Sequence, residues 1–258
     1  MSEWTAHYHG RVDEGQTDDA VPPAEGVPAC HLVAGWSFGA GMFDELRRHL
    51  AGPVVAHDWR AFAADRLGND GKDCRQGGVW LGWSLGGTLL LEAIARGRLA
   101  PDRLLLVGAT PRFLAGDDWP GVPMAEWRAL RRAARRDPRQ AACGFRERFA
   151  LPDCEQWSVG EAADVAGLDW LAQVDARELL GRLRVPTELW LAPDDPLIPA
   201  DWIRHLPLSE VVVSRSLPAA GHGAIFECWQ ELAQALAGPA GRDPFAAACR
   251  PGAEPINR

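Results

Sequence analysis

Several features that would point to a particular class of protein are missing from this 258-residue chain. No apolar run approaches the roughly 20 residues that a helix needs to cross a bilayer, so we expect no membrane-spanning segment. None of the six cysteines has the C-x-x-C spacing of zinc ribbons and thioredoxin-like sites. Net positive charge is absent as well, and the formal net charge of −8 argues against general nucleic-acid binding.

The two ends of the chain differ in composition from the rest. Residues 1–26 are polar and acidic and lack the apolar core of a secretory signal, so we expect a cytoplasmic protein with all six cysteines as free thiols. We interpret this stretch as a leader that is either disordered or an edge hairpin. Residues 238–258 are rich in Gly, Pro and Ala and are expected to form a loose tail. We expect a monomer.

Between these ends, short apolar runs alternate with helical patterns, which predicts an α/β fold with a mostly parallel central sheet flanked by helices. Residues 111–183 interrupt the alternation with a helical, arginine-rich stretch, so the core is expected at 27–110 and 184–237, with 111–183 as an inserted helical lid. Residues 59–76 are expected to be irregular, with one helical turn at 60–65. Strands are predicted at 28–34, 54–57, 78–83, 103–107, 187–191 and 211–214, and helices at 42–50, 84–96, 200–205 and 225–236.

A serine in a tight turn is the most informative feature. Residues 79–87 read VWLGWSLGG, so an apolar strand ends in Gly-x-Ser-x-Gly and a helix follows. This is the context in which a serine acts as a nucleophile. Gly82 and Gly86 leave space for the turn, and the turn would raise the Ser84 hydroxyl above the sheet edge. The sequence therefore predicts Ser84 as a catalytic nucleophile.

A serine nucleophile needs a base and an orienting acid, which follow it in the order Asp/Glu, then His. Of the two downstream histidines, His222 lies in a Gly-flanked loop before the last helix, whereas His205 ends a helical pattern and is a weaker candidate. The acid is expected after the strand at 187–191, where Asp195 precedes a turn proline. Asp195 is our choice for the acid, and Asp194 stays open as its close rival.

An oxyanion hole is expected beside the serine. The backbone N–H of Leu85 begins the helix after the nucleophile, where helix N–H groups lack partners. A second donor should come from the loop after the first core strand, which places the N–H of Trp36 opposite that of Leu85. Trp36 and Leu85 are thus predicted both as oxyanion donors and as substrate-binding residues. Phe145 and Phe149, four residues apart, are predicted to line the acyl channel, although they could equally form the lid core.

With these motifs the chain resembles the α/β-hydrolase superfamily and, within it, the pimeloyl-[acyl-carrier protein] methyl ester esterases of biotin synthesis. The likeness covers most of residues 30–236. It is carried by the VWLGWSLGG run, Gly35-Trp36, the Asp118-Trp119-Pro120-Gly121 segment, and the loops at 195–199 and 221–222. Ala34 departs from the histidine usual before the oxyanion-loop glycine. The resemblance implies hydrolysis of the methyl ester of pimeloyl-acyl carrier protein, with release of methanol.

The predicted lid concentrates positive charge on an acidic chain. Residues 128–148 hold eight arginines against two acidic residues, which gives about +6. Such a patch suits an acidic macromolecular partner, and acyl carrier proteins are strongly acidic. A solvated helix face is the alternative interpretation. The predicted carrier-docking residues are Arg128, Arg131, Arg132, Arg135, Arg136, Arg146 and Arg148.

Two other classes of function remain open. The same residues would serve a broad small-ester carboxylesterase or a thioesterase, because acyl-transfer chemistry does not fix the substrate. A non-catalytic α/β-hydrolase-fold protein that binds a ligand is the alternative of another class, although it would have no need of the full set of catalytic residues. We expect no metal and no cofactor, because the glycine-rich loop at 35–41 lacks the Walker lysine and the dinucleotide-binding spacing.

Overall fold

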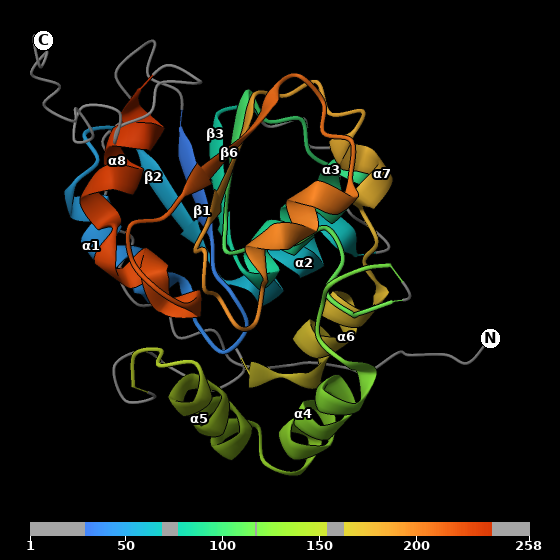
Figure 1. The fold of residues 1–258 in the computed structure, drawn as a ribbon. Helices are drawn as coiled ribbons and strands as arrows, with labels where there is room; N and C mark the ends of the chain where they lie inside the picture. The colour runs from blue at the N-terminus through green and yellow to red at the C-terminus, as the bar shows by residue number, and fades with distance from the viewer. Residues whose placement is uncertain (1–28, 69–76, 117, 154–162, 239–258) are drawn as a thin grey trace, which may run out of the picture.

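The computed structural model describes residues 29–68, 77–116, 118–153 and 163–238, and its centre is a six-stranded parallel sheet (Figure 1). The strand order is β2-β1-β3-β4-β5-β6, and every neighbouring pair is parallel. The predicted leader and nearly all of the predicted tail lie outside the described residues. The strands are β1 (Cys30–Val33), β2 (Val54–His57), β3 (Val79–Trp83), β4 (Arg103–Val107), β5 (Thr187–Leu191) and β6 (Val212–Ser216).

The sheet separates two apolar clusters. Strands β3, β4 and β5 are buried along their whole length, as expected for parallel strands covered on both faces. Side chains alternate between the faces, so in β4 Leu104 and Leu106 join one cluster while Leu105 and Val107 join the other. The α/β fold predicted from the alternating pattern, with a parallel central sheet flanked by helices, is confirmed by this architecture.

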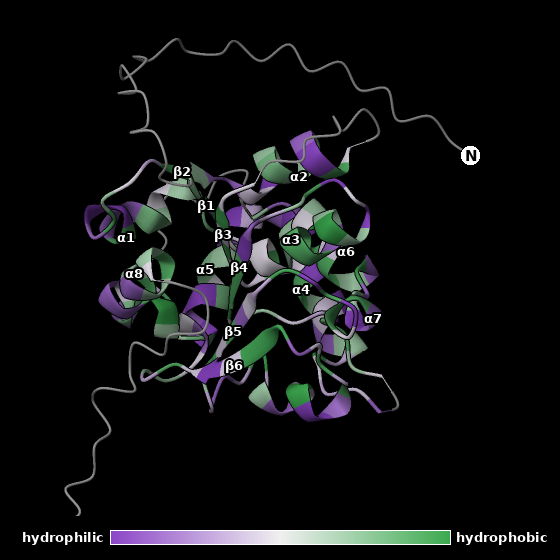
Figure 2. Cartoon of the chain, turned by 90° about the horizontal axis from the view of Figure 1, so that it is seen from above, coloured by the Kyte–Doolittle hydropathy of each residue, from purple (hydrophilic) through white to green (hydrophobic). Residues whose placement is uncertain are grey.

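Helices cover both faces of the sheet (Figure 2). On one side lie α1 (Asp44–Arg48) and α8 (Trp229–Ala237), which contact each other. On the other side lie α2 (Trp59–Leu67) and α3 (Leu85–Ala95). Three short 3-10 helices complete the core: η1 (Ala40–Phe43), η3 (Ala200–His205) and η4 (His222–Glu227).

The stretch between β4 and β5 forms a helical cap. It contains α4 (Met124–Arg136), α5 (Pro138–Arg148), α6 (Val165–Gln173) and α7 (Arg177–Leu180). In Figure 1, α4 and α5 lie side by side beyond one edge of the sheet, and α6 lies between α4 and the core. The break between α4 and α5 follows from the sequence: Pro138 begins α5, and the Asp137 side chain caps that helix by accepting a 2.9 Å hydrogen bond from the Gln140 N–H.

Two expectations from the sequence are wrong. Residues 59–67 form the full helix α2 rather than a single turn, with Asp58 as its N-cap accepting from the Arg60 N–H at 2.8 Å. Cys143 is disulfide-bonded, whereas Cys30 and Cys228 are free and buried as expected. Within the described ranges, none of the helices is long and apolar enough to cross a membrane.

Candidate active site

Three side chains that follow three different strands meet at one edge of the sheet. Ser84 follows β3, Asp195 follows β5 and His222 follows β6, and parallel strands bring their carboxyl ends to the same edge. The Ser84 Oγ lies 2.9 Å from His222 Nε2, and His222 Nδ1 lies 2.8 Å from Asp195 Oδ2. The structure therefore brings together Ser84, His222 and Asp195, which the sequence predicts as nucleophile, base and acid.

Ser84 is held in a strained backbone conformation. Its φ of 53° and ψ of −122° lie outside the regions that L-residues usually adopt. The glycines on either side make this turn possible, because a Cβ on Gly82 would lie 2.6 Å from the Gly87 backbone. A Cβ on Gly86 would lie 2.2 Å from the Val33 carbonyl oxygen. The strain raises the hydroxyl toward His222 at the start of α3.

The two neighbouring aspartates have different partners. Asp195 is buried, and its Oδ1 accepts hydrogen bonds from the Leu197 and Ile198 N–H groups at 2.8 and 2.9 Å, while Oδ2 faces His222. Asp194 is exposed and accepts a 3.0 Å hydrogen bond from the Gly221 N–H. Asp195 thus orients the imidazole of His222, and Asp194 holds the backbone of the loop from which His222 extends.

Aromatic rings enclose the imidazole. His222 is 2 % exposed, with the Trp83 ring at 5.3 Å and the Phe149 ring at 6.4 Å, measured between ring centroids. Such a setting keeps water from the imidazole and limits the orientation of its ring. Trp83 comes from the core strand β3 and Phe149 from the end of α5, so core and cap both contribute to the wall.

The loop after β1 passes close to the nucleophile. A Cβ on Gly35 would lie 2.8 Å from the Trp83 ring and 3.1 Å from the Ser84 Cβ, so glycine lets the loop come this close. Trp36 and Ser37 follow in a turn that is closed by the 3.2 Å hydrogen bond from the Phe38 N–H to the Gly35 carbonyl. On the other side, Leu85 is the first residue of α3, and its N–H therefore has no acceptor within the helix.

Curated proteins with similar sequences are esterases. The chain is 30% identical over 243 residues to the pimeloyl-[acyl-carrier protein] methyl ester esterase of Xanthomonas oryzae pv. oryzae (strain MAFF 311018), covering 81% of this chain and 93% of that relative. The esterase of the same description from Klebsiella pneumoniae subsp. pneumoniae is 28% identical, over 66% and 77% of the two chains. The chain belongs to the α/β-hydrolase family, among relatives of these esterases. No protein-family model matches it.

Solved structures support the same fold. An esterase from Exiguobacterium antarcticum superposes with a TM-score of 0.63 at 20% identity, covering 81% of this chain and 90% of that one. A bromoperoxidase from Bacillus anthracis gives a TM-score of 0.66 at 16% identity over the same shares. At these identities the likeness establishes the fold and leaves the substrate open.

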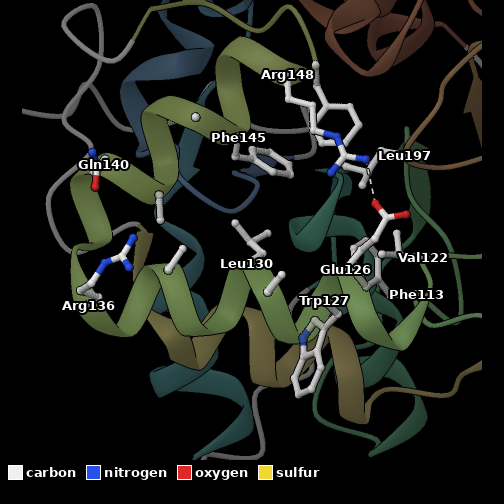
Figure 3. Close-up of a pocket in the computed structure, with 15 residues that line it drawn as sticks. Phe113, Val122, Glu126, Trp127, Leu130, Arg136, Gln140, Phe145, Arg148 and Leu197 are labelled. Atoms are coloured by element: carbon white, nitrogen blue, oxygen red, sulfur yellow. Dashed lines mark hydrogen bonds and ion pairs between the residues drawn. The ribbon is translucent and has the colours of Figure 1, made fainter.

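A pocket of about 470 Å³ in this α/β-hydrolase opens between α4 and α5 (Figure 3). Phe145 and Phe149, predicted as acyl-channel residues, are part of its wall, and Phe145 and Leu130 point into it from facing helices. The Phe145 ring also meets Trp36 edge-on at 5.2 Å, so this part of the pocket wall contacts the loop after β1. Leu85, also predicted to bind substrate, is fully buried in the core and is not among the residues that line this pocket.

The predicted arginine patch is only partly available. Arg128, Arg132, Arg135 and Arg136 are exposed and form no ion pair with any residue in the described part of the chain. Arg131 instead pairs with Asp169, and Arg148 with Glu126.

Arg146 does not belong to an exposed docking surface. Its side chain is 1 % exposed because it turns inward from α5 to the oxyanion loop, where it donates to Ser37. Sequence spacing alone gave no sign of this contact, since the two residues are 109 positions apart. Among the described residues, no group of three or more His, Cys, Asp and Glu could hold a metal ion.

Proposed function

We propose that this protein is a serine esterase in which Ser84, His222 and Asp195 form the catalytic triad. The observation that carries the proposal is the continuous row of hydrogen bonds, 2.9 Å from serine to histidine and 2.8 Å from histidine to aspartate. Support comes from the curated esterases with similar sequences, the first of which aligns with this chain over 93% of its own length. The strained turn at Ser84 adds to it, because this conformation presents the hydroxyl to a substrate.

In the proposed reaction, His222 Nε2 takes the proton of the Ser84 hydroxyl while Oγ attacks the ester carbonyl carbon. The imidazolium that forms is stabilised by Asp195, which accepts the Nδ1–H hydrogen bond. When the tetrahedral intermediate collapses, the alkoxy group leaves as an alcohol with the proton from His222. Water, activated by the same histidine, then releases the acid and restores the serine.

The negative oxygen of the intermediate is assigned to the N–H groups of Leu85 and Trp36. Leu85 offers the free N–H at the start of α3, where the helix dipole also favours negative charge. Trp36 offers its N–H from the loop that approaches Ser84 through Gly35. Preorganised donors of this kind contribute about 10²- to 10³-fold each to the rate in serine hydrolases.

As substrate we propose the methyl ester of pimeloyl-acyl carrier protein, with pimeloyl-acyl carrier protein and methanol as products. The names of the relatives suggest it. A pocket of about 470 Å³ with an apolar wall suits an acyl chain, and it opens beside α4, the helix that carries the four exposed arginines. We assign the docking of an acidic carrier to Arg128, Arg132, Arg135 and Arg136, of which Arg136 also lines the pocket.

The proposed chemistry is tested with p-nitrophenyl butyrate and a fluorophosphonate probe. We expect turnover and labelling at Ser84 in the wild type, and loss of both in Ser84→Ala, with kcat lower by about 10⁴-fold or more. Ser214→Ala, which removes an exposed serine from β6, is the matched control and should behave as the wild type. If the folded wild type neither turns over esters nor is labelled, the protein is a non-catalytic binding protein instead.

A further inference from the structure

The guanidinium of Arg146 is buried against the oxyanion loop. Its Nε donates to the Ser37 Oγ at 3.3 Å, one terminal nitrogen donates to the Ser37 carbonyl oxygen, and the other donates to the Asp153 carbonyl oxygen at 2.9 Å. The central carbon of the guanidinium lies 3.7 Å from the centre of the Phe38 ring. Each of the three guanidinium nitrogens thus donates to residue 37 or 153, and the face of the group covers an aromatic ring.

The contacted residue is the strained one in the loop. Ser37 has a φ of 70°, a left-handed conformation that costs energy for any residue other than glycine, and its side chain is fully buried. Its carbonyl would be left without a partner if the arginine were removed, and an unpaired buried carbonyl is costly. The turn that contains Ser37 also sets the direction of the preceding Trp36 N–H, the proposed oxyanion donor.

The cap holds the same loop at a second point. The Trp36 indole Nε1–H donates to the Asp164 carbonyl oxygen at 2.9 Å, at the N-cap of α6. The fit there is close, because a Cβ on Gly167 of α6 would lie 2.7 Å from the Trp36 ring. Helices α5 and α6 therefore fix the Trp36-Ser37 turn from two sides, whereas the core strand β1 fixes only its beginning.

We propose that Arg146 is a positioning residue that sets the conformation of the Trp36-Ser37 turn, so that the oxyanion hole is complete only when the cap is seated. The inference rests on the proposed esterase function. It assigns to the cap a catalytic effect beyond substrate binding, because α5 carries both Arg146 and the pocket residue Phe145. Displacement of α5 would move the donor as well as the pocket wall.

The geometry requires arginine in particular. Three nitrogens of one planar group reach two backbone carbonyls and a hydroxyl in different directions, which a lysine ammonium on a flexible stem does not reproduce. Burial lowers the pKa of Arg146 to about 10, yet the group remains protonated at neutral pH. A charged donor strengthens each of these hydrogen bonds.

The test compares Arg146→Met and Arg146→Lys with Arg177→Met. Arg177 is a matched control from α7, because it pairs with Asp175 and lies 5.4 Å from the Trp119 ring without touching the oxyanion loop. Each variant is assayed for kcat and KM on p-nitrophenyl butyrate, for inhibition by a trifluoromethyl ketone, which forms a tetrahedral adduct with the serine, and for thermal unfolding. Assays are run at temperatures where each variant is folded.

We expect both Arg146 variants to lose about 10- to 100-fold in kcat, less than the loss expected for removing a donor outright, with KM changed less than about threefold. The inhibition constant of the ketone should rise by the factor by which kcat/KM falls. Arg177→Met should lower the unfolding temperature and leave kcat unchanged.

A wild-type kcat in either folded Arg146 variant, or a loss confined to KM, would overturn the proposal. If Arg146→Met does not fold, Arg146→Lys decides alone, since it keeps the positive charge and most of the volume. Failure of the proposed function is a separate result, because it would be seen in the wild type as absence of any ester turnover.

Discussion

At the scale of single residues, two adjacent aspartates show how burial separates roles that the sequence leaves open. Asp194 and Asp195 both follow β5, and the order of residues alone favours neither decisively. The difference lies in direction: the carboxylate of Asp195 turns into the core toward His222, and that of Asp194 stays at the surface. Such a distinction depends on the path of the turn at 192–199, which sequence patterns do not resolve.

We predict that Asp195→Asn lowers kcat by about 10⁴-fold, because an amide facing Nδ1 would favour the wrong tautomer of His222. Asp194→Asn is the matched control and should remain within a few-fold of the wild type, since its amide oxygen can still accept from the Gly221 N–H. Initial rates on p-nitrophenyl butyrate measure both. Equal losses in the two variants would contradict the assignment of the acid.

The sequence could predict the nucleophile turn and could not predict the contact of Arg146 with Ser37. Gly82, Ser84 and Gly86 lie within five positions of one another, so a local motif records their shared geometry. Arg146 looks like any other member of a basic helix in the sequence. Its inward direction follows from how α5 lies on the loop after β1, which no local pattern encodes.

At the scale of elements, helix α2 is longer than the sequence pattern predicts, because a charged residue lies on its buried face. Trp59, Phe62, Ala63 and Leu67 follow a helical period, but the buried position between them is Arg66. Its guanidinium lies 6.0 Å from the Trp80 ring, and its Nε pairs with Asp65 at 2.8 Å, so the long side chain is accommodated inside. A search for apolar residues at helical spacing therefore does not detect the full helix.

Helix α4 carries the proposed carrier-docking surface, and charge reversal there tests it. We expect the double variant Arg128→Glu, Arg132→Glu to lose about 10-fold or more in kcat/KM on a carrier-bound ester and to keep the wild-type rate on p-nitrophenyl butyrate. The matched control is Arg47→Glu, Arg48→Glu on α1, which makes the same change in net charge at two exposed helical positions. The lower kcat/KM of the α4 variant should come from weaker association between the enzyme and the carrier protein.

Equal effects of the two double variants on the carrier-bound ester would mean that net charge matters and the site on α4 does not. No effect of either would leave the arginines of α4 as a solvated helix face. Raising the ionic strength is a further check, because salt weakens attraction between exposed charges and, at 0.1 M, largely screens charges more than about 10 Å apart. The carrier-bound ester should respond to salt more strongly than the small ester.

At the scale of the whole molecule, the sequence predicted the α/β core well and the cap poorly. Strand positions follow from short apolar runs, and the bounds of β2, β4 and β5 agree with those expected. The cap is held to the core by contacts between distant residues, such as Trp36 with Asp164 and Phe149 with His222. The sequence of the cap predicts its helices but not where these helices pack against the core.

Stability of the whole fold should fall on mild acidification because of a histidine pair, in which His31 is buried and His57 is partly buried. His31 Nδ1 lies 3.1 Å from His57 Nε2, and both rings stack with Trp80. Desolvation, with the charges of His57 and Arg66 adding to it, lowers the pKa of His31 to about 4, and burial also lowers the pKa of His57. Below about pH 6.5 these two histidines therefore bind more protons in the unfolded chain than in the folded protein.

We predict that the free energy of unfolding is independent of these two groups above about pH 7 and decreases as the pH falls from about 6.5 toward 4. Urea unfolding at several pH values measures it. His31→Phe keeps an aromatic ring in the stack and removes one titrating group. The free energy of unfolding of this variant should therefore fall less steeply with decreasing pH than that of the wild type. The difference in slope should be a fraction of the about 1.4 kcal/mol per pH unit that corresponds to one proton. An unchanged slope would contradict this account.

The most direct test of the central claim is hydrolysis of pimeloyl-acyl carrier protein methyl ester by the wild type and by Ser84→Ala, run beside p-nitrophenyl butyrate. Mass spectrometry of the carrier would detect loss of the methyl group. We predict faster turnover of the carrier-bound ester than of the small ester, with both activities lost in the variant. Turnover of the small ester alone would keep the triad but contradict the carrier-bound substrate, and carrier turnover that survives in Ser84→Ala would contradict the triad itself.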